Sequence, residues 1–174
     1  TRLSGHPPAR GIPDIPFATG SLGHGIGLAA GLALGQRLNG SPGRVVCLTS
    51  DGEWNEGSTW ESLIFARHQQ LDNLAVIVDQ NGLQGFGRTS EVADLVPLAD
   101  KFKAFGVTTV EVDGHDQAAV ADALRTRTSS GPLMIVARTT KGCGVSFMED
   151  RLEWHYLPMT ELQYEQACRE VAGS

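Results

Sequence analysis

The sequence predicts an α/β fold in which a parallel sheet carries helices on both of its faces. Short apolar runs rich in β-branched residues read as strands buried on both sides, and they occupy 45–49, 74–78, 107–112 and 133–137. Helical patterns separate these runs, and such alternation is typical of βαβ units. The chain has 174 residues, 41% apolar and 20% charged, so we expect one domain over residues 1–174.

Helix positions follow from apolar periodicity and capping signals. Residues 1–16 are rich in proline and glycine, so a loop is expected there. The pattern then predicts a buried helix from His24 to Asn39. The other expected helices run from the Ser58-x-x-Glu61 capping box to Gln70, over 95–105, over 116–128, and from the Thr160-x-x-Gln163 box to Ala172.

Composition excludes several classes of function. Lys and Arg number 14 against 20 Asp and Glu, a net charge of −6, and no basic block is present, so nucleic acid is not expected as a partner. The longest apolar stretch, 26–35, is shorter than the ~20 residues of a membrane helix, and no signal-peptide pattern opens the chain. We expect a cytoplasmic protein that binds no membrane. Its odd number of widely spaced cysteines predicts reduced thiols.

Polar residues that follow two of the predicted strands form a candidate metal site. Asp51 follows the first strand and Asn81 the second, about one βαβ repeat apart, so both are expected at the carboxyl edge of the sheet, where ligands bind. A carboxylate, an amide oxygen and a loop carbonyl suit Mg²⁺ or Ca²⁺, and a diphosphate would complete the coordination. Asp-Gly and Asn-Gly are also common turn formers, so each pair alone is weak evidence.

A glycine-rich turn at 19–27 leads directly into the first predicted helix. The exposed amides of such a turn approach an anion closely, although this signal is weak alone. The segment Gly25-Ile26-Gly27-Leu28-Ala29-Ala30 also fits the G-x-G-x-x-A pattern of nicotinamide dehydrogenases. That pattern must follow a strand, and the proline-bounded residues 13–18 make a poor one.

The sequence resembles the thiamine-diphosphate enzymes of the transketolase family, and specifically the N-terminal, diphosphate-binding subunit of split transketolases. The likeness spans the whole chain. The family's G-D-G…N-N motif is matched by Ser50-Asp51-Gly52 with Gln80-Asn81, its T-G-S-L-G-Q-G turn by 19–25, and its G-H-P element by 5–7. Residues 141–149 with Glu153-Trp154-His155 are similar to its K-G-K-G-V-S-F-M-E and E-W-H segments.

The resemblance implies a role for particular residues. It implies Asp51, Asn81 and the carbonyl of Leu83 as ligands of Mg²⁺, with Ca²⁺ as a possible substitute. It implies Glu56, His6 and His155 as catalytic residues, with Glu56 linking cofactor sites across a subunit interface. Residues implied in contact with thiamine diphosphate are Gly20, Ser21, Leu22, His24, Gly52, Glu53, Asn81 and His155.

By the same resemblance, the chain is expected to transfer a two-carbon ketol unit from a ketose, with a phosphorylated one favoured, to an aldose. The glutamate that acts on the cofactor's pyrimidine ring belongs to a second domain in this family, so the expected partner is a pyrimidine-binding C-terminal subunit in a heterotetramer. The family's upstream G-H segment is absent from this sequence, and Ser50, Gln80, His24, Cys143 and Tyr156 depart from its pattern. A non-catalytic scaffold or regulatory subunit is the main alternative, ahead of an NAD-dependent dehydrogenase.

Overall fold

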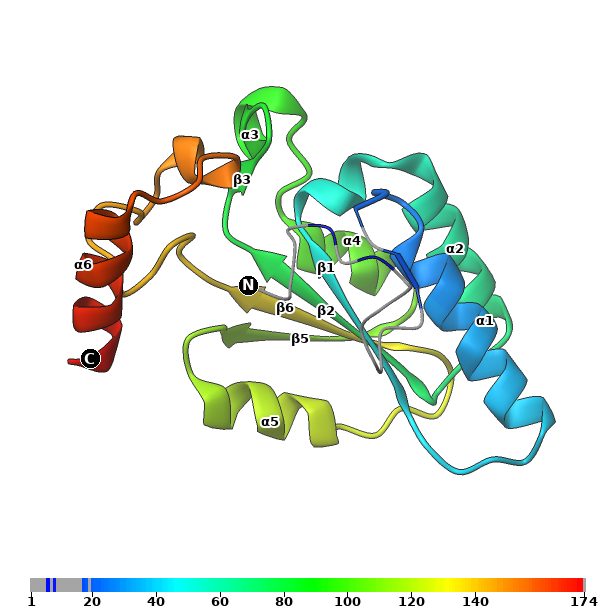
Figure 1. The fold of residues 1–174 in the computed structure, drawn as a ribbon. Coiled ribbons are helices and arrows are strands. Elements are labelled where there is room, and N and C mark those ends of the chain that lie inside the picture. The colour runs from blue at the N-terminus through cyan, green and yellow to red at the C-terminus, as the bar shows by residue number, and fades with distance from the viewer. Residues whose placement is uncertain (1–5, 7, 9–16, 19, 174) are drawn as a thin grey trace.

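A four-stranded parallel sheet forms the centre of the protein. The computed structural model describes residues 6, 8, 17, 18 and 20–173. The sheet contains β1 (Val45–Ser50), β2 (Leu74–Gln80), β6 (Leu133–Arg138) and β5 (Thr108–Asp113), in the order β1-β2-β6-β5. Every neighbouring pair is parallel, which confirms the predicted fold class (Figure 1).

Helices cover both faces of the sheet, but unequally. The larger core lies under α1 (Gly25–Leu38), α2 (Gly57–His68) and α4 (Leu98–Ala104), and it includes the fully buried Trp54 and Phe102 (Figure 1). Opposite side chains of β2 and β6 meet α5 (Gln117–Arg125) in a smaller core of Ala75, Ala123, Leu133 and Ile135. Within the described residues, α5 is thus the helix that covers this second face of the sheet.

The prediction that all four strands are buried on both faces was wrong for the outer two. β1 lies at an edge of the sheet, and on the side that α5 covers its Val46 and Leu48 are 51% and 72% exposed. β5 forms the other edge and buries none of its residues fully. Strand order decides which strand is central, and a βαβ pattern along the chain does not encode that order.

Most predicted helices are present, with shifted ends. The Thr160–Gln163 capping box is confirmed at the start of α6 (Glu161–Ala172). The Ser58–Glu61 box was wrong, because α2 starts at Gly57 without a side-chain cap and the Ser58 hydroxyl donates to the carbonyl of Gly23 instead, at 2.9 Å. α5 ends at Arg125, where the Arg44 guanidinium donates to the carbonyls of Leu124 and Thr126.

The first helix matches its expected bounds but is not fully buried. α1 buries Ile26 and three alanines, while Leu28, Leu32 and Leu38 are exposed. No helix within the described ranges is long and apolar enough to cross a bilayer. The three cysteines are free thiols, as expected. The loop predicted for 1–16 lies outside the described residues except at His6 and Pro8.

Short elements at the carboxyl edge of the sheet were not predicted. They are the 3-10 turn η1 (Gly52–Asn55), a hairpin of β3 (Leu83–Gln84) and β4 (Gly87–Arg88), the single turn α3 (Thr89–Val92), and η2 (Leu152–His155). Figure 1 shows the hairpin and η2 side by side above the sheet, with α6 set apart from the other helices. These elements surround the strand ends where the candidate site lies.

Candidate functional site

The loops that carry Asp51 and Asn81 meet at the carboxyl edge, as the spacing of these residues predicts. Ser50 of β1 pairs with Asp79 of β2, so the loops that follow both strands leave the sheet together. The Asp51 carboxylate accepts the N–H groups of Gly52 at 2.8 Å and Gly82 at 2.6 Å. It therefore bridges the two loops, and it is only 4% exposed.

The loop after β2 is held by the side chain of Asn81. Its amide oxygen accepts the N–H of Leu83 at 3.0 Å, and its amide nitrogen donates to Asp79 at 3.0 Å. Asp79 in turn accepts from the Thr139 hydroxyl. The Leu83 residue named by the resemblance is thus fixed in β3, directly beside Asn81.

The electrostatics of this cluster suit a cation. Burial raises the pKa of the Asp51 carboxyl, the N–H groups of Gly82 and Gly52 lower it, and the nearby Asp79 raises it further. Within the described part of the chain, no Lys, Arg or His forms an ion pair with Asp51. The described residues also contain no group of three or more His, Cys, Asp or Glu arranged for a metal ion. The available carboxylate, amide and carbonyl oxygens are nevertheless the hard ligands that Mg²⁺ takes together with water and phosphate oxygens.

The glycine turn ahead of α1 is fastened to the loop after β1. The N–H of Gly23 donates to Glu53 at 3.0 Å, and Glu53 is buried. Gly23 has φ +82°, and a Cβ there would overlap the Ser58 hydroxyl and come within 2.9 Å of the Glu56 Cβ. Only glycine fits this backbone and this close contact. The turn, η1 and the start of α2 are therefore packed as one unit.

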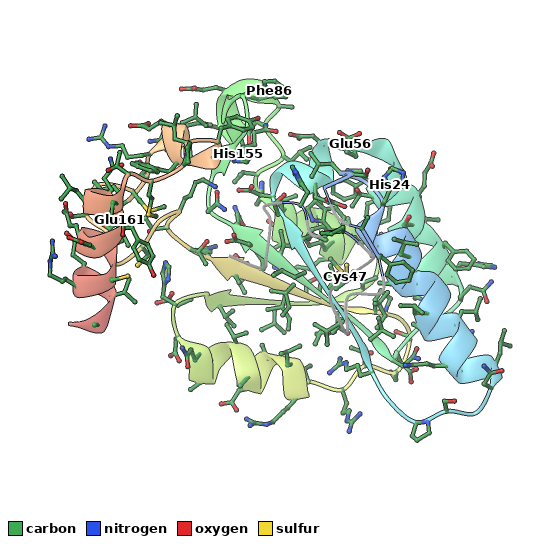
Figure 2. All side chains as sticks on the ribbon, in the orientation of Figure 1. His24, Cys47, Glu56, Phe86, His155 and Glu161 are labelled. Atoms are coloured by element: carbon green, nitrogen blue, oxygen red, sulfur yellow. The ribbon has the colours of Figure 1, made fainter. Side chains whose placement is uncertain are left out.

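Two histidines flank the turn. The ring of His6 lies against Gly20, where a Cβ would overlap it, and Gly20 has φ +106°. The exposed His24 precedes α1 (Figure 2). Its Nδ1 lies 2.9 Å from the carbonyl oxygen of Leu22. The structure thus brings both predicted residues to the turn.

The strand that a G-x-G-x-x-A dinucleotide fingerprint requires is not found ahead of α1 in the described residues. Phe17, Ala18 and residues 20–24, which precede α1 in the described chain, contain no strand. A dinucleotide fingerprint needs a strand ahead of its helix. This argues against the dehydrogenase alternative.

Glu56 lies at the rim of this unit, exposed, as the N-cap residue of α2. Its side chain makes no capping hydrogen bond, although its backbone N–H donates to the backbone carbonyl of Glu53 at 3.2 Å. Figure 2 shows Glu56 at the same end of the molecule as His24 and His155. This carboxylate is accessible to a neighbouring molecule, and the predicted interface role remains a proposal.

His155 ends η2 and lies beside the β3–β4 hairpin. Partial burial lowers the pKa of its imidazole, and the positive charges of Lys141 and His6 lower it further. His6 and His155 are thus electrostatic neighbours although they lie almost at opposite ends of the chain. The His6 ring lies against Gly20, whereas the His155 ring lies beside Gly85.

The hairpin that carries Leu83 is fixed on two sides. Gln84 donates to the Asn55 side chain at 3.1 Å, and Arg88 forms an ion pair with Asp150 at 2.6 Å. Our sequence interpretation missed this hairpin and its partners. The sequence did contain a signal for a tight hairpin, because glycines occupy positions 82, 85 and 87 within six residues.

These features define a class of protein. A parallel sheet, a glycine-rich turn before a helix, and carboxylate, amide and carbonyl oxygens at the strand ends are together typical of α/β proteins that bind a phosphate-bearing cofactor at the carboxyl edge. Residues 1–172 match the family described as the transketolase, thiamine diphosphate binding domain. The chain belongs to this family.

The relatives include proteins named as transketolase subunits. The chain is 42% identical to a subunit of the apulose-4-phosphate transketolase of Actinobacillus succinogenes, over 98% of this chain and 62% of that protein. It is 36% identical to the 6-deoxy-6-sulfo-D-fructose transketolase subunit SqwG of a Clostridium species, over 98% and 63%. The chain thus spans somewhat less than two thirds of the length of these relatives.

Solved transketolases share the fold. The transketolase of Campylobacter jejuni superposes with a TM-score of 0.81 at 28% identity, covering 91% of this chain and 26% of that one. The transketolase of Leishmania mexicana gives a TM-score of 0.77 at 29% identity, covering 89% and 25%. The similarity therefore extends over nearly all of the described chain.

Proposed function

We propose that this chain is the diphosphate-binding subunit of a transketolase-type enzyme that moves a two-carbon ketol unit from a ketose to an aldose. The observation that carries the proposal is the meeting of the Asp51 and Asn81 loops beside the turn at Gly20–Gly23. Family membership over residues 1–172 supports the same activity.

The cofactor of the proposed enzyme is thiamine diphosphate with Mg²⁺, and Ca²⁺ would also satisfy hard oxygen ligands. Asp51, Asn81 and the Leu83 carbonyl would hold the metal ion. The residues that would line the cofactor are Gly20, Ser21, Leu22, His24, Gly52, Glu53, Asn81 and His155. When bound, the cofactor supplies a nucleophilic carbon and an electron sink, while the protein supplies binding and orientation.

The remaining roles are divided among three side chains. His6 and His155 would orient the sugar hydroxyls, and the close approach of the His6 ring to Gly20 in the proposed cofactor turn supports this assignment for His6. A neutral imidazole both donates and accepts hydrogen bonds, and the lowered pKa of His155 favours the neutral form. Glu56 would transmit protons or charge between cofactor sites across a subunit interface, consistent with its exposure.

The substrate we propose is a ketose that carries an anionic group. Two relatives are named for such sugars, apulose 4-phosphate and 6-deoxy-6-sulfo-D-fructose. The word "subunit" in both names supports a second polypeptide here as well. We propose that this partner is pyrimidine-binding and that the assembly is a heterotetramer.

Calorimetry with thiamine diphosphate tests the cofactor site. The parent chain is expected to bind with Mg²⁺ present and not with EDTA. Asp51→Asn should abolish binding, because it removes the buried charge that the cation needs while preserving side-chain size. Asp72→Asn is the matched control, since Asp72 is exposed and precedes β2 at the opposite end of the sheet.

Equal affinity with and without Mg²⁺ would contradict the metal assignment. Circular dichroism of both variants shows whether Asp51→Asn still folds, because Asp51 also bridges two loops. Tight Mg²⁺-dependent binding without ketol transfer in the assembled protein would favour the scaffold or regulatory alternative.

A further inference from the structure

Gly85, His155 and Tyr156 converge from two distant segments of the chain. Gly85 lies at the turn of the β3–β4 hairpin, His155 ends η2, and Tyr156 follows it. A Cβ built on Gly85 would overlap the Tyr156 hydroxyl and lie 3.6 Å from Nε2 of His155. The tip of the tyrosine and the ring of the histidine therefore both close on one backbone position.

Space explains the glycine at position 85, since its φ lies outside the left-handed region that favours glycine. Other glycines at the site, such as Gly20 and Gly23, have a positive φ and so need glycine for their backbone as well. At Gly85 the missing side chain is what allows the phenol to approach. Gly85 and Tyr156 thus form a complementary pair.

Tyr156 also contacts His155 directly. The two rings are 4.6 Å apart between centroids with an interplanar angle of 64°, an edge-to-face arrangement. The backbone N–H of Tyr156 donates to the backbone carbonyl of Glu153 at 3.3 Å, and this hydrogen bond links Tyr156 to η2. Tyr156 is nevertheless 69% exposed, so burial of apolar surface does not account for its placement.

The hairpin on the other side of this contact is itself anchored. Gln84 bonds to Asn55, and Arg88 pairs with Asp150. Figure 2 shows His155 next to this hairpin, whose tip carries Phe86. A side chain that fixes His155 against the hairpin therefore also fixes it relative to Leu83, at the base of the same hairpin.

We propose that Tyr156 is a positioning residue that holds His155 against the Gly85 turn, in the place from which His155 contacts the substrate. The proposal rests on the proposed function for its catalytic consequence. Tyr156 acts through His155, and Gly85 provides the room that it requires.

A double-mutant cycle in the enzyme assembled with its partner tests the proposal. Tyr156→Ala should raise KM for the ketose donor or lower kcat by roughly 10- to 100-fold, the order expected when a reacting group is misplaced. Tyr156→Phe, which keeps the ring but loses the hydroxyl that lies on Gly85, should fall between the parent and Tyr156→Ala. In a His155→Ala background, Tyr156→Ala should have no further effect, because its effect is transmitted by His155.

A second measurement does not depend on activity. Gly85→Ala keeps both rings but displaces them, so the ring resonances of His155 in the NMR spectrum of the full chain should shift at a fixed pH of about 8, where a histidine of ordinary pKa is neutral. Gly35→Ala is the control, since a Cβ there meets nothing within 4 Å.

Each outcome decides the proposal. Additive losses in the cycle, or loss of activity in Tyr156→Phe equal to that in Tyr156→Ala, would overturn the positioning role. If the parent assembly proves to have no transketolase activity, the proposed function fails. The NMR result still tests the contact of His155 with the Gly85 turn, and unmoved resonances in Gly85→Ala would reject the proposal.

Discussion

Two buried carboxylates at the site, Asp51 and Glu53, are satisfied by backbone N–H groups. Asp51 accepts from Gly52 and Gly82, whereas Glu53 accepts from Gly23. Hydrogen bonds to the ionised form offset part of the desolvation of a buried carboxylate. Asp51 joins the two strand-end loops and Glu53 holds the glycine turn. The residue predicted as a metal ligand and the residue predicted to contact the cofactor therefore also shape the site.

Glu56→Gln tests the predicted separation between cofactor binding and turnover. Glu56 is exposed and makes no capping bond, so Mg²⁺-dependent binding of thiamine diphosphate by the chain should stay within about twofold of the parent, a difference well under the 1.4 kcal/mol of a tenfold change. Turnover of the assembled enzyme should fall by ~10²–10⁴-fold, the usual loss when a proton-transfer group is removed.

Glu61→Gln on the same helix is the control and should change neither quantity. Loss of cofactor binding in Glu56→Gln with intact assembly would instead place Glu56 in the diphosphate site.

The ionisation of His155 gives a second prediction. Partial burial, Lys141 and His6 hold the pKa of His155 below its ordinary value, so an NMR titration should find it below 6.5. Lys141→Gln should move that pKa upward, while Lys103→Gln, whose ammonium pairs with Asp100, should not. Between the lowered and the ordinary pKa the unfolded chain binds more protons, so this group makes stability rise with pH in that window.

An unchanged His155 pKa in Lys141→Gln would show that the lysine charge does not reach the ring.

The candidate site was predictable where sequence distance translates directly into strand register. Asp51 and Asn81 were located from one βαβ repeat, and β1 and β2 do pair side by side. The contact of Gly85 with Tyr156 was not predictable, because it depends on how two irregular loops cross. Hydrogen bonds that hold those loops, such as Arg88 to Asp150, leave no periodic trace in the sequence.

Among the secondary-structure elements, the positions of strands and helices along the chain were predicted better than the tertiary contacts of their residues. The runs at 74–78 and 133–137 are buried central strands, whereas β1 exposes Val46 and Leu48. The composition of a strand does not distinguish a central position from an edge. Similarly, Ser58 has the residue type of a helix cap, but its hydroxyl bonds to Gly23 because tertiary packing brings that carbonyl close.

The α6 helix provides a prediction for a single element. The Thr160 backbone N–H donates to the side-chain oxygen of Gln163 at 2.9 Å. The Gln163 backbone N–H donates in return to the Thr160 hydroxyl at 3.3 Å. Because α6 fully buries only Ala167, loss of this cap should affect the helix locally. Thr160→Ala should destabilise α6 by about 1 kcal/mol.

Hydrogen exchange should detect this as several-fold faster exchange of α6 amides, with the amides of β2 and β6 unchanged. Glu165→Gln, an exposed position within the helix, is the control. Uniform acceleration over the whole chain would show instead that α6 unfolds only together with the sheet.

On the scale of the whole molecule, apolar side chains gather around the candidate site without being buried. Leu22 lies in the glycine turn, Phe86 is 86% exposed at the hairpin tip, and Tyr156 and Leu157 follow η2. Large exposed aromatic residues beside a polar site are typical of positions that a protein partner covers. The rim of the carboxyl edge therefore has the character of an interface.

The last prediction concerns catalysis by the assembly. The described chain contains one parallel sheet, whose strand ends supply the metal and diphosphate ligands of the proposed site. The rim residues leave that edge accessible to water, whereas the chemistry that the cofactor would supply requires a site from which water is excluded. The purified chain should therefore show no ketol transfer alone, and activity should appear on mixing with a pyrimidine-binding subunit, with an optimum at a fixed ratio.

Phe86→Ser should weaken assembly while leaving Mg²⁺-dependent cofactor binding intact, because Phe86 lies at the hairpin tip rather than at Leu83. Analytical ultracentrifugation and a coupled ketol-transfer assay measure both effects, and steady-state turnover by the chain without a partner would refute the requirement.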